Sequence, residues 1–238
     1  KLMLKIKVIS AHPEMFPGTL GYSIIGKALK EKKFMLEVIN LHDFGIDNRK
    51  TIDDEPFGGG PGMILRPDVV EKALLSINSE AKKDKILRIF LTPSGKTLNQ
   101  KKLTEYSKLE ELIILCGRFE GVDQRAINVL NFEEISLGDY ILAGGESAAQ
   151  VLVEGCIRLI PGVLGQPESL LEESFSNNLL EYPQFTRPKV WEDANNFKHE
   201  VPEILTSGHH EKIKKWRHEK SIEKTNLFRP DLLKKDKI

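Results

Sequence analysis

The chain has 238 residues, of which 40% are hydrophobic and 29% charged, and its 35 basic and 35 acidic side chains cancel. This composition is typical of a soluble globular protein. No apolar run approaches the ~18 residues that span a bilayer, and the charged start of the chain is too short for a signal peptide. We therefore expect a cytoplasmic protein with no membrane partner. Cys116 and Cys156 are too few for a disulfide framework or a metal cluster, so we expect two buried, reduced thiols.

The charge is unevenly distributed along the chain. Residues 198–238 contain 11 Lys and Arg against 7 Asp and Glu, a net charge of +4, which leaves −4 on the preceding residues. A basic C-terminal segment fits either a contact with a phosphate backbone or a solvated helical surface. Charge alone does not decide between these two interpretations.

Short apolar runs alternate with amphipathic segments over the first 160 residues. The runs predict strands at residues 5–10, 35–41, 85–91, 111–116 and 132–136. The amphipathic spacing predicts helices at residues 19–32, 67–79, 99–107, 122–130 and 146–159, with one further helix near residues 209–224. This order is typical of an α/β fold with a mostly parallel sheet and helices on both faces.

Two stretches interrupt the alternation. Residues 47–65 contain four glycines and read as a loop that is long for a compact domain, which favours a functional role. Residues 161–188 contain four prolines and little apolar periodicity, so we expect a linker.

Polar loops with glycines follow three of the predicted strands, at residues 92–95, 116–121 and 137–146. Loops that follow parallel strands meet at one edge of a sheet, so the three loops predict one composite pocket. Arg118 is the exceptional cation among them, so the pocket suits an uncharged heterocycle and ribose better than a triphosphate. Each loop taken alone is also explained as a tight turn.

Other motifs in these loops are weaker. Residues 94–97 end like a nucleotide-binding P-loop, but Phe90 stands where that motif requires its first glycine, which argues against an NTPase. Four carboxylates, on Glu120, Asp123, Asp139 and Glu146, fit acid–base chemistry, a cation or helix caps. For Asp123, at a predicted helix start, a helix-terminus role is favoured.

Several segments occur in the order found in one enzyme family. They are DEPFGGGPGM (54–63), CGRFEGVD (116–123), GDYILAGGE (138–146), IPGVLG (160–165) and Thr186-Arg187-Pro188. Together they resemble the bacterial tRNA (guanine-N1)-methyltransferases of the SPOUT superfamily, from His12 nearly to the end of the chain. The family methylates N1 of guanine 37, next to the anticodon, and so supports maintenance of the reading frame.

The resemblance implies an architecture that strand–helix alternation does not. It implies a C-terminal trefoil knot in an S-adenosylmethionine-binding domain (residues 1–162), although knots are very rare in proteins. A flexible linker (163–188) and a small all-helical tRNA-binding domain (189–238) would follow. It further implies a homodimer with active sites at the subunit interface, and it leaves a role for Mg²⁺ open.

The resemblance also assigns residues. The implied cofactor-binding residues are Phe90, Leu91, Thr92, Pro93, Gly117, Glu120, Gly121, Ser136, Leu137, Gly138, Asp139, Tyr140, Ile141, Leu142, Gly144 and Gly145. The implied tRNA contacts are Arg187, Lys212, Lys215 and Arg217.

For catalysis, the resemblance implies Glu173 as the base and Arg158 as its assisting cation. The family usually has aspartate at position 173, and the neighbouring Glu172 is a rival for the role. A non-catalytic RNA-binding protein of the same fold is the alternative function, since a longer carboxylate side chain shifts the proton acceptor.

Overall fold

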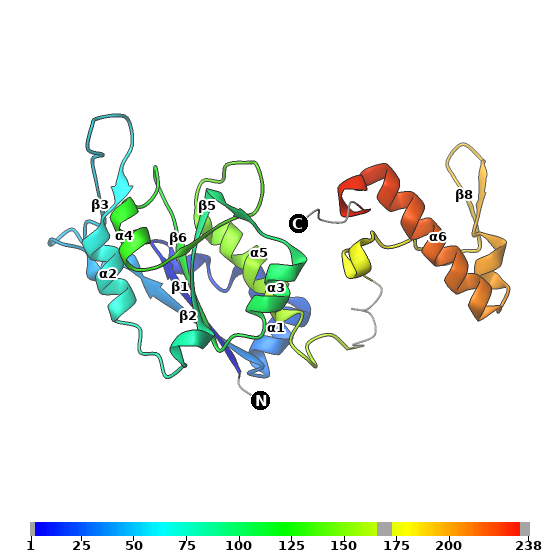
Figure 1. Cartoon of the computed structure of the whole chain (residues 1–238), viewed down its shortest axis with the longest axis horizontal. Coiled ribbons are helices and arrows are strands. Elements are labelled where there is room, and N and C mark those ends of the chain that lie inside the picture. Colours follow the sequence, from blue (N-terminus) through cyan, green and yellow to red (C-terminus); the bar gives the residue numbers. More distant parts are fainter. Residues whose placement is uncertain (1–2, 166–172, 234–238) are drawn as a thin grey trace. The chain divides into compact units, whose positions relative to one another are not determined.

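The computed structural model describes residues 3–165 and 173–233. The chain divides into two compact units, residues 1–165 and 166–238, each with its own secondary structure (Figure 1). Within the described residues, no helix is both long enough and apolar enough to cross a membrane.

The first unit is built on a five-stranded sheet with the order β2-β1-β6-β5-β7. Its strands are β1 (Leu4–Ser10), β2 (Phe34–Asn40), β5 (Ile86–Thr97), β6 (Glu111–Cys116) and β7 (Glu133–Ser136). Every neighbouring pair is parallel. The predicted α/β class with a mostly parallel sheet is therefore confirmed.

Strand β6 lies at the centre of the sheet, and all of its residues are buried. Its apolar run is continuous because both faces of a central parallel strand are covered by helices. Leu112 and Ile114 point to one core layer, whereas Ile113 and Leu115 point to the other. The sheet thus separates two hydrophobic layers.

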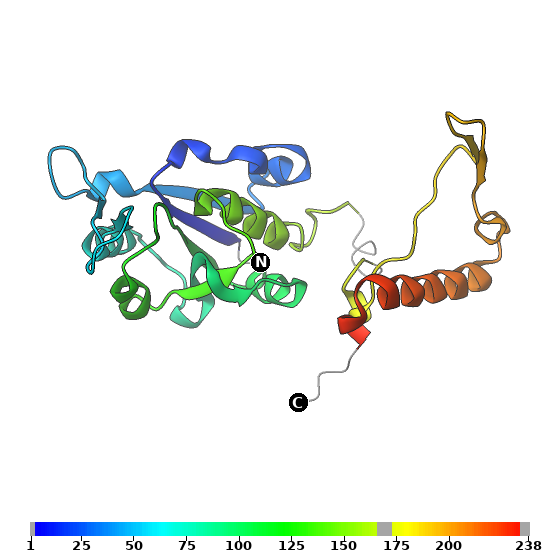
Figure 2. The same cartoon turned by 90° about the horizontal axis from the view of Figure 1, so that it is seen from above.

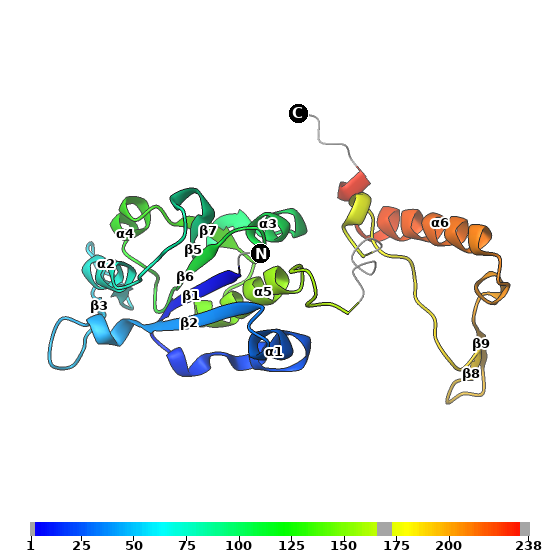
Figure 3. The same ribbon diagram turned by 90° about the horizontal axis from the view of Figure 1, so that it is seen from below.

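Helices cover both faces of the sheet, as Figure 3 shows and the view from above in Figure 2 repeats. One layer contains residues of α1 (Ser23–Lys30), α3 (Gln100–Tyr106) and α5 (Gly145–Ile157). The other contains residues of α2 (Pro67–Leu75) and α4 (Gln124–Val129). Short 3-10 turns include Pro13–Met15, Gly18–Gly21, Leu41–Phe44 and Lys83–Lys85.

Strand β5 is longer than predicted. It continues beyond Leu91 to Thr97, because its pairing with β7 shifts register between Leu91 and Lys96. Gly95 lies in this irregular stretch, and a Cβ atom at its position would stand 2.4 Å from the backbone nitrogen of Ile135. The backbones of β5 and β7 therefore approach more closely at Gly95 than a side chain would permit.

Other boundaries also differ from the prediction. The predicted helix 19–32 begins only at Ser23, because Tyr22 is extended and ends the 3-10 turn Gly18–Gly21. The predicted long loop 47–65 contains a two-stranded hairpin, β3 (Asp53–Asp54) with β4 (Ile64–Leu65). A hairpin of two-residue strands carries no periodicity that sequence could reveal.

The second unit is not all-helical, which corrects the prediction. It contains helix α6 (His210–Phe228) and the antiparallel hairpin of β8 (Val190–Glu192) and β9 (Lys198–Glu200), with 3-10 turns at Glu203–Thr206 and Pro230–Leu233. Asp193 closes the hairpin, because its Oδ1 accepts the backbone N–H groups of Asn195 and Phe197. The sequence feature that indicates this hairpin is an Asp-x-Asn turn between two short β-prone segments.

Candidate functional site

Residues 90–93 of β5, together with the loops that follow β6 and β7, line a cavity of about 280 Å³ in the first unit. All predicted cofactor-binding residues line it except Asp139, which is exposed. The structure therefore brings together residues from three segments that are separate in the sequence. Among the described residues, the lining also includes Arg118, Phe119, Ile135, Ala143 and Ala148, which the prediction omitted.

The walls of the cavity are mostly apolar or made of backbone. Leu91 and Ile135 are buried at its base, whereas Tyr140, Ile141 and Leu142 are exposed along its rim. Such a surface can cover the faces of a flat heterocycle, while backbone N–H and C=O groups at glycines read its edge.

Local turns hold the loops in shape. Ser136 accepts the backbone N–H of Gly138 at 3.1 Å, and its hydroxyl donates to the carbonyl oxygen of Gly138 at 3.2 Å. Gly121 has a φ of +128°, which an L side chain rarely adopts. Gly121 and Gly138 therefore permit turns in which the backbone itself lies close to the cavity.

A buried ion pair lies beside the cavity. Arg118 Nη2 stands 2.9 Å from Glu146 Oε2, and the Glu146 side chain is completely buried. Ser10 Oγ donates to the other carboxylate oxygen, Oε1, at 2.7 Å. Of the four carboxylates singled out in the sequence, Glu146 is therefore the one held inside the fold.

Both cysteines are buried and free. Burial, followed by the neighbouring Glu146 carboxylate, holds the pKa of the Cys116 thiol well above its ordinary value. Burial raises the pKa of Cys156 to about 12. Neither thiol is a nucleophile near neutral pH, which confirms the expectation of two small buried side chains.

The β3–β4 hairpin supports the loop that follows β6. The backbone N–H of Glu120 donates to the carbonyl of Met63 at 2.9 Å, and the N–H of Leu65 donates to the carbonyl of Gly121 at 3.0 Å. A Cβ atom on Gly62 would stand 2.3 Å from the Glu120 side chain. Two segments that carry the family resemblance, 54–63 and 116–123, are thus joined in space.

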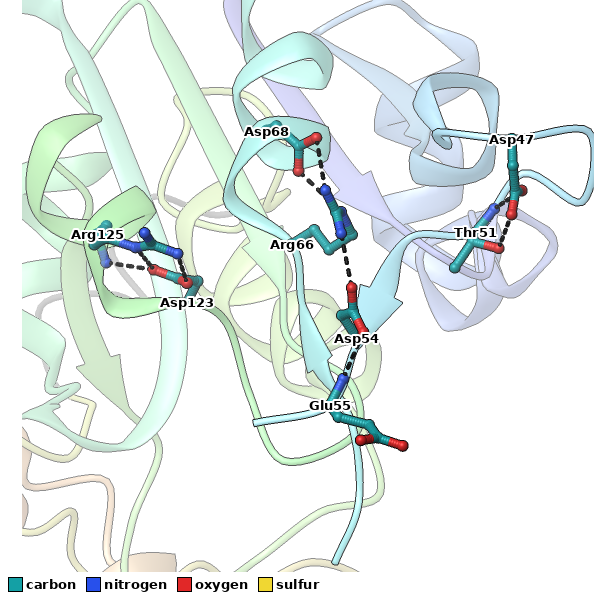
Figure 4. Close-up of polar contacts among 8 residues, drawn as sticks. All are labelled: Asp47, Thr51, Asp54, Glu55, Arg66, Asp68, Asp123 and Arg125. Atoms are coloured by element: carbon teal, nitrogen blue, oxygen red, sulfur yellow. Dashed lines mark hydrogen bonds and ion pairs between the residues drawn. The ribbon is translucent and has the colours of Figure 1, made fainter. Parts of the chain in front are cut away.

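Charged side chains secure the base of this hairpin (Figure 4). Arg66 donates to Asp54 at 2.8 Å and binds both carboxylate oxygens of Asp68 at 3.1 and 3.2 Å. The hydrogen bonds from Arg66 lower the pKa of Asp68. This cluster of Arg66, Asp54 and Asp68, called the hairpin clamp below, links β3 to the first turn of α2.

Asp123, also drawn in Figure 4, caps helix α4. Its Oδ1 accepts the backbone N–H of Arg125 at 2.9 Å, and both carboxylate oxygens pair with the Arg125 guanidinium. These hydrogen bonds lower the pKa of Asp123. The interpretation of Asp123 as a helix-terminus residue is therefore confirmed.

The two predicted catalytic residues belong to different units. Arg158 follows α5 in the first unit, where it is half-buried and its backbone N–H donates to the carbonyl of Glu154. Glu173 is half-buried in the second unit and lines a cavity of about 860 Å³ there, with neighbours that include Tyr182 and Trp216. Glu172, its rival, lies outside the described residues.

The predicted tRNA contacts differ in their surroundings. Arg187, Lys212 and Lys215 are exposed, and Lys215 pairs with Glu219 one turn along α6 at 3.9 Å. The guanidinium of Arg217 is half-buried and lies 4.7 Å from the centre of the Tyr182 ring. Arg217 therefore also packs the interior of the second unit.

No candidate metal centre emerges from the part of the chain that the structure describes. There, no three or more His, Cys, Asp or Glu side chains gather as a metal ion would require.

Comparisons with known proteins show which enzymes this chain is similar to. The family model described as tRNA (guanine-1)-methyltransferase TrmD matches residues 4–235. A tRNA (guanine-N(1)-)-methyltransferase of Wolbachia pipientis is 47% identical over 99% of both chains. The enzyme of that name from Rhodospirillum rubrum is 48% identical over 97% of this chain and 93% of its own length. One from Ehrlichia canis is 47% identical over 97% of this chain and 96% of its own.

Proposed function

This chain belongs to the tRNA (guanine-1)-methyltransferase family, and from that premise we propose how its residues carry out the reaction. It is a tRNA (guanine-N1)-methyltransferase, and membership of the family implies S-adenosylmethionine as the methyl donor. The observation that carries the proposal is the cavity of about 280 Å³ lined by residues 90–93 of β5 and by the loops after β6 and β7. We assign this cavity to S-adenosylmethionine.

The residues around the cavity suit this ligand. Its volume of about 280 Å³ lies just below the roughly 300–1,000 Å³ typical of small-molecule sites. Leu91 and Ile135 offer apolar contact for an adenine ring, and Gly117, Gly144 and Gly145 let backbone approach it closely. When bound, S-adenosylmethionine supplies an activated methyl group on a sulfonium leaving group. The protein then has to orient the acceptor and manage its proton.

The acceptor atom dictates which protein groups are needed. Guanine N1 carries a proton at neutral pH, so a base must remove it before the lone pair can attack. We propose that Glu173 accepts this proton. We propose that Arg158 stabilises the negative charge that develops on guanine O6.

Glutamate at position 173 is compatible with this role. It keeps the carboxylate that the family's usual aspartate provides, but adds one methylene group and one rotatable bond. A displacement of about 1 Å can lower a rate roughly 100-fold unless the surroundings compensate. Glu172 is the competing base, and the experiment below separates the two residues.

The second unit is proposed to hold the tRNA. Exposed Arg187, Lys212 and Lys215 offer cations to phosphates, and the target is guanine 37, whose methylation supports the reading frame. Mg²⁺ remains an optional partner of the bound nucleotides.

The proposed division is a catalytic domain (1–162), a linker (163–188) and a tRNA-binding domain (189–238). Within that linker, the backbone N–H of Leu180 donates to Thr225 of α6 at 2.8 Å.

A homodimer in the cytoplasm is the proposed working form. Tyr22, Ile24 and Val151 are all exposed in the first unit, at 76%, 46% and 55%. Gln150 hydrogen-bonds Thr19, so the segment before α1 and the exposed side of α5 are neighbours. An apolar surface of this kind is typical of a face covered by a second copy.

A trefoil knot is the proposed topology of the loops around the cavity. Supporting it, a Cβ atom on Gly145 would stand 2.8 Å from Cys116 Cα, and one on Gly95 would stand 2.4 Å from Ile135 N. Backbone segments that are distant in sequence therefore come into direct contact, and the proposal rests on this close approach.

The decisive experiment measures transfer of labelled methyl from S-adenosylmethionine to tRNA transcripts with guanine or adenine at position 37. Wild-type protein is expected to label only the guanine transcript. Glu173→Gln should lose activity by about 10²–10⁴-fold, the usual contribution of a positioned base, whereas Glu172→Gln should keep it. Full activity of Glu173→Gln contradicts the assigned base. No transfer by wild-type protein that still binds tRNA indicates the non-catalytic alternative.

A further inference from the structure

The Arg118–Glu146 ion pair lies at the wall of the cofactor cavity, which Arg118 itself lines. A Cβ atom on Gly144, which lines the cavity, would stand 2.4 Å from Arg118 Nε and 2.7 Å from Glu146 Oε2. Both charges are withdrawn from water, since the Arg118 side chain is 18% exposed and that of Glu146 is 0% exposed. Their charges therefore act on the cavity with little screening.

Further contacts hold Arg118 in this place. Its guanidinium donates to Met15 Sδ at 3.1 Å and to the carbonyl of Ala143 at 3.4 Å. Ser10 donates to Glu146, and the first turn of α5 carries Glu146 itself. The pair thus has a single arrangement set by β1, the loop after β6 and α5.

The pair determines the electrostatic balance of the cavity. Among the described lining residues, Arg118 and Glu120 are the ones with charged side chains. Without Glu146, the guanidinium of Arg118 would lose the carboxylate that it contacts, and the charge beside Gly144 would become more positive by one unit. An added positive charge weakens the binding of a positively charged ligand and leaves the binding of a neutral ligand almost unaffected.

The reaction converts a positively charged ligand into a neutral one. S-adenosylmethionine carries a positive sulfonium, and after methyl transfer the same sulfur is a neutral thioether in S-adenosylhomocysteine. We propose that Glu146, by neutralising Arg118, is the residue that sets the preference of the cavity for the sulfonium over the thioether. This inference rests on the proposed assignment of the cavity to S-adenosylmethionine.

The test compares the dissociation constants of the two ligands by calorimetry. For Glu146→Gln, the ratio of thioether affinity to sulfonium affinity should rise on the order of tenfold, because one unit charge is removed beside the cavity, where the effective dielectric constant is about 20. The double variant Arg118→Gln/Glu146→Gln should return the ratio close to that of the wild type, because it removes both charges. Ser10→Ala, which removes a hydrogen bond but no charge, should leave the ratio unchanged.

Folding defects are separated from charge effects in two ways. Thermal unfolding of each variant reports stability, and a purely structural role of Glu146 would weaken both ligands equally. Equal weakening in Glu146→Gln, or an unrestored ratio in a folded double variant, overturns the inference. Should Glu146→Gln not fold, Arg118→Gln gives the opposite test, since its unpaired carboxylate should lower the ratio. A wrong cavity assignment gives a different result: in that case Leu142→Trp, which enlarges a side chain lining the cavity, binds both ligands as well as the wild type.

Discussion

Gly145 donates its backbone N–H to the carbonyl oxygen of Gly117, with 2.9 Å between nitrogen and oxygen. This bond ties the first turn of α5 to the loop that follows β6. Both glycines line the cavity, so its shape depends on how closely these two backbones approach.

Replacing Gly145 by alanine is expected to disrupt this approach. The new methyl group would stand 2.8 Å from Cys116 Cα and 2.9 Å from Gly117 N, and neither backbone can move without shifting β6 or α5. We expect the free energy of unfolding to fall by about 1–3 kcal/mol, as for other overpacked interiors, and S-adenosylmethionine to bind more weakly. Urea unfolding and calorimetry measure the two effects.

The matched control for this substitution is Gly165→Ala, because no atom of the described residues lies within 4 Å of the added methyl group there. Its stability and affinity should equal those of the wild type. A Gly145→Ala protein that behaves like this control would show that the crossing tolerates a side chain.

Neutralising Lys212 and Lys215 is expected to weaken tRNA binding. Both side chains are exposed on α6, where a lysine that pairs with a phosphate releases counterions. For the double variant Lys212→Gln/Lys215→Gln, the slope of log affinity against log salt concentration should become shallower by about one for each phosphate that the protein no longer neutralises. Filter binding of a tRNA transcript over a range of salt concentrations provides the measurement.

Lys101→Gln serves as its control, since Lys101 is an exposed lysine on α3 of the first unit. Its slope should match that of the wild type. If the slopes of the double variant and the control are the same, the basic surface of α6 is only a solvated helix.

The hairpin clamp is expected to make stability depend on pH. Hydrogen bonds from Arg66 lower the pKa of Asp68 below its ordinary value of 3.8 in the folded protein. The folded state therefore binds this proton less readily than the unfolded state, so the stabilisation is present above about pH 3.8 and is lost as the pH falls through the lowered pKa. Asp68→Asn should lower the melting temperature at pH 6 and have a smaller effect near pH 3.

Thermal unfolding of both proteins between pH 3 and pH 7 measures this difference. Asp84→Asn is a suitable control, because Asp84 lies outside the hairpin clamp, in the 3-10 turn Lys83–Lys85. A gap between wild type and Asp68→Asn that stays constant with pH would contradict the role given to Arg66.

Sequence patterns predicted the sheet well because strand type follows from local composition. The run from Glu111 to Cys116 is apolar throughout after its first residue and has the predicted boundaries. The same patterns did not predict that β5 continues to Thr97, because that extension depends on pairing with β7 after a register shift. They also missed the β8–β9 hairpin, whose short strands are exposed on both sides.

The candidate site shows a similar division. The glycine-bearing loops and the ordered family motifs predicted most of the lining residues of the cavity from the sequence. From the sequence, Arg118 could be identified only as an exceptional cation in the loops. Its ion pair with Glu146 could not be predicted, because Glu146 lies 28 positions further along the chain. Asp139 belongs to the same motif as the lining residues, but it does not line the cavity.

The sequence by itself therefore determined the α/β class, the loops that would carry the ligand and the family of the enzyme, because periodicity and ordered motifs are properties of neighbouring residues. Only the tertiary structure decided that Gly145 binds Gly117, that the β3–β4 hairpin supports Glu120, and that Glu146 neutralises Arg118. Each of these contacts joins segments whose meeting depends on the register and packing of the whole sheet. Packing around one sheet is a collective outcome of all the strands and helices, so no local pattern encodes it.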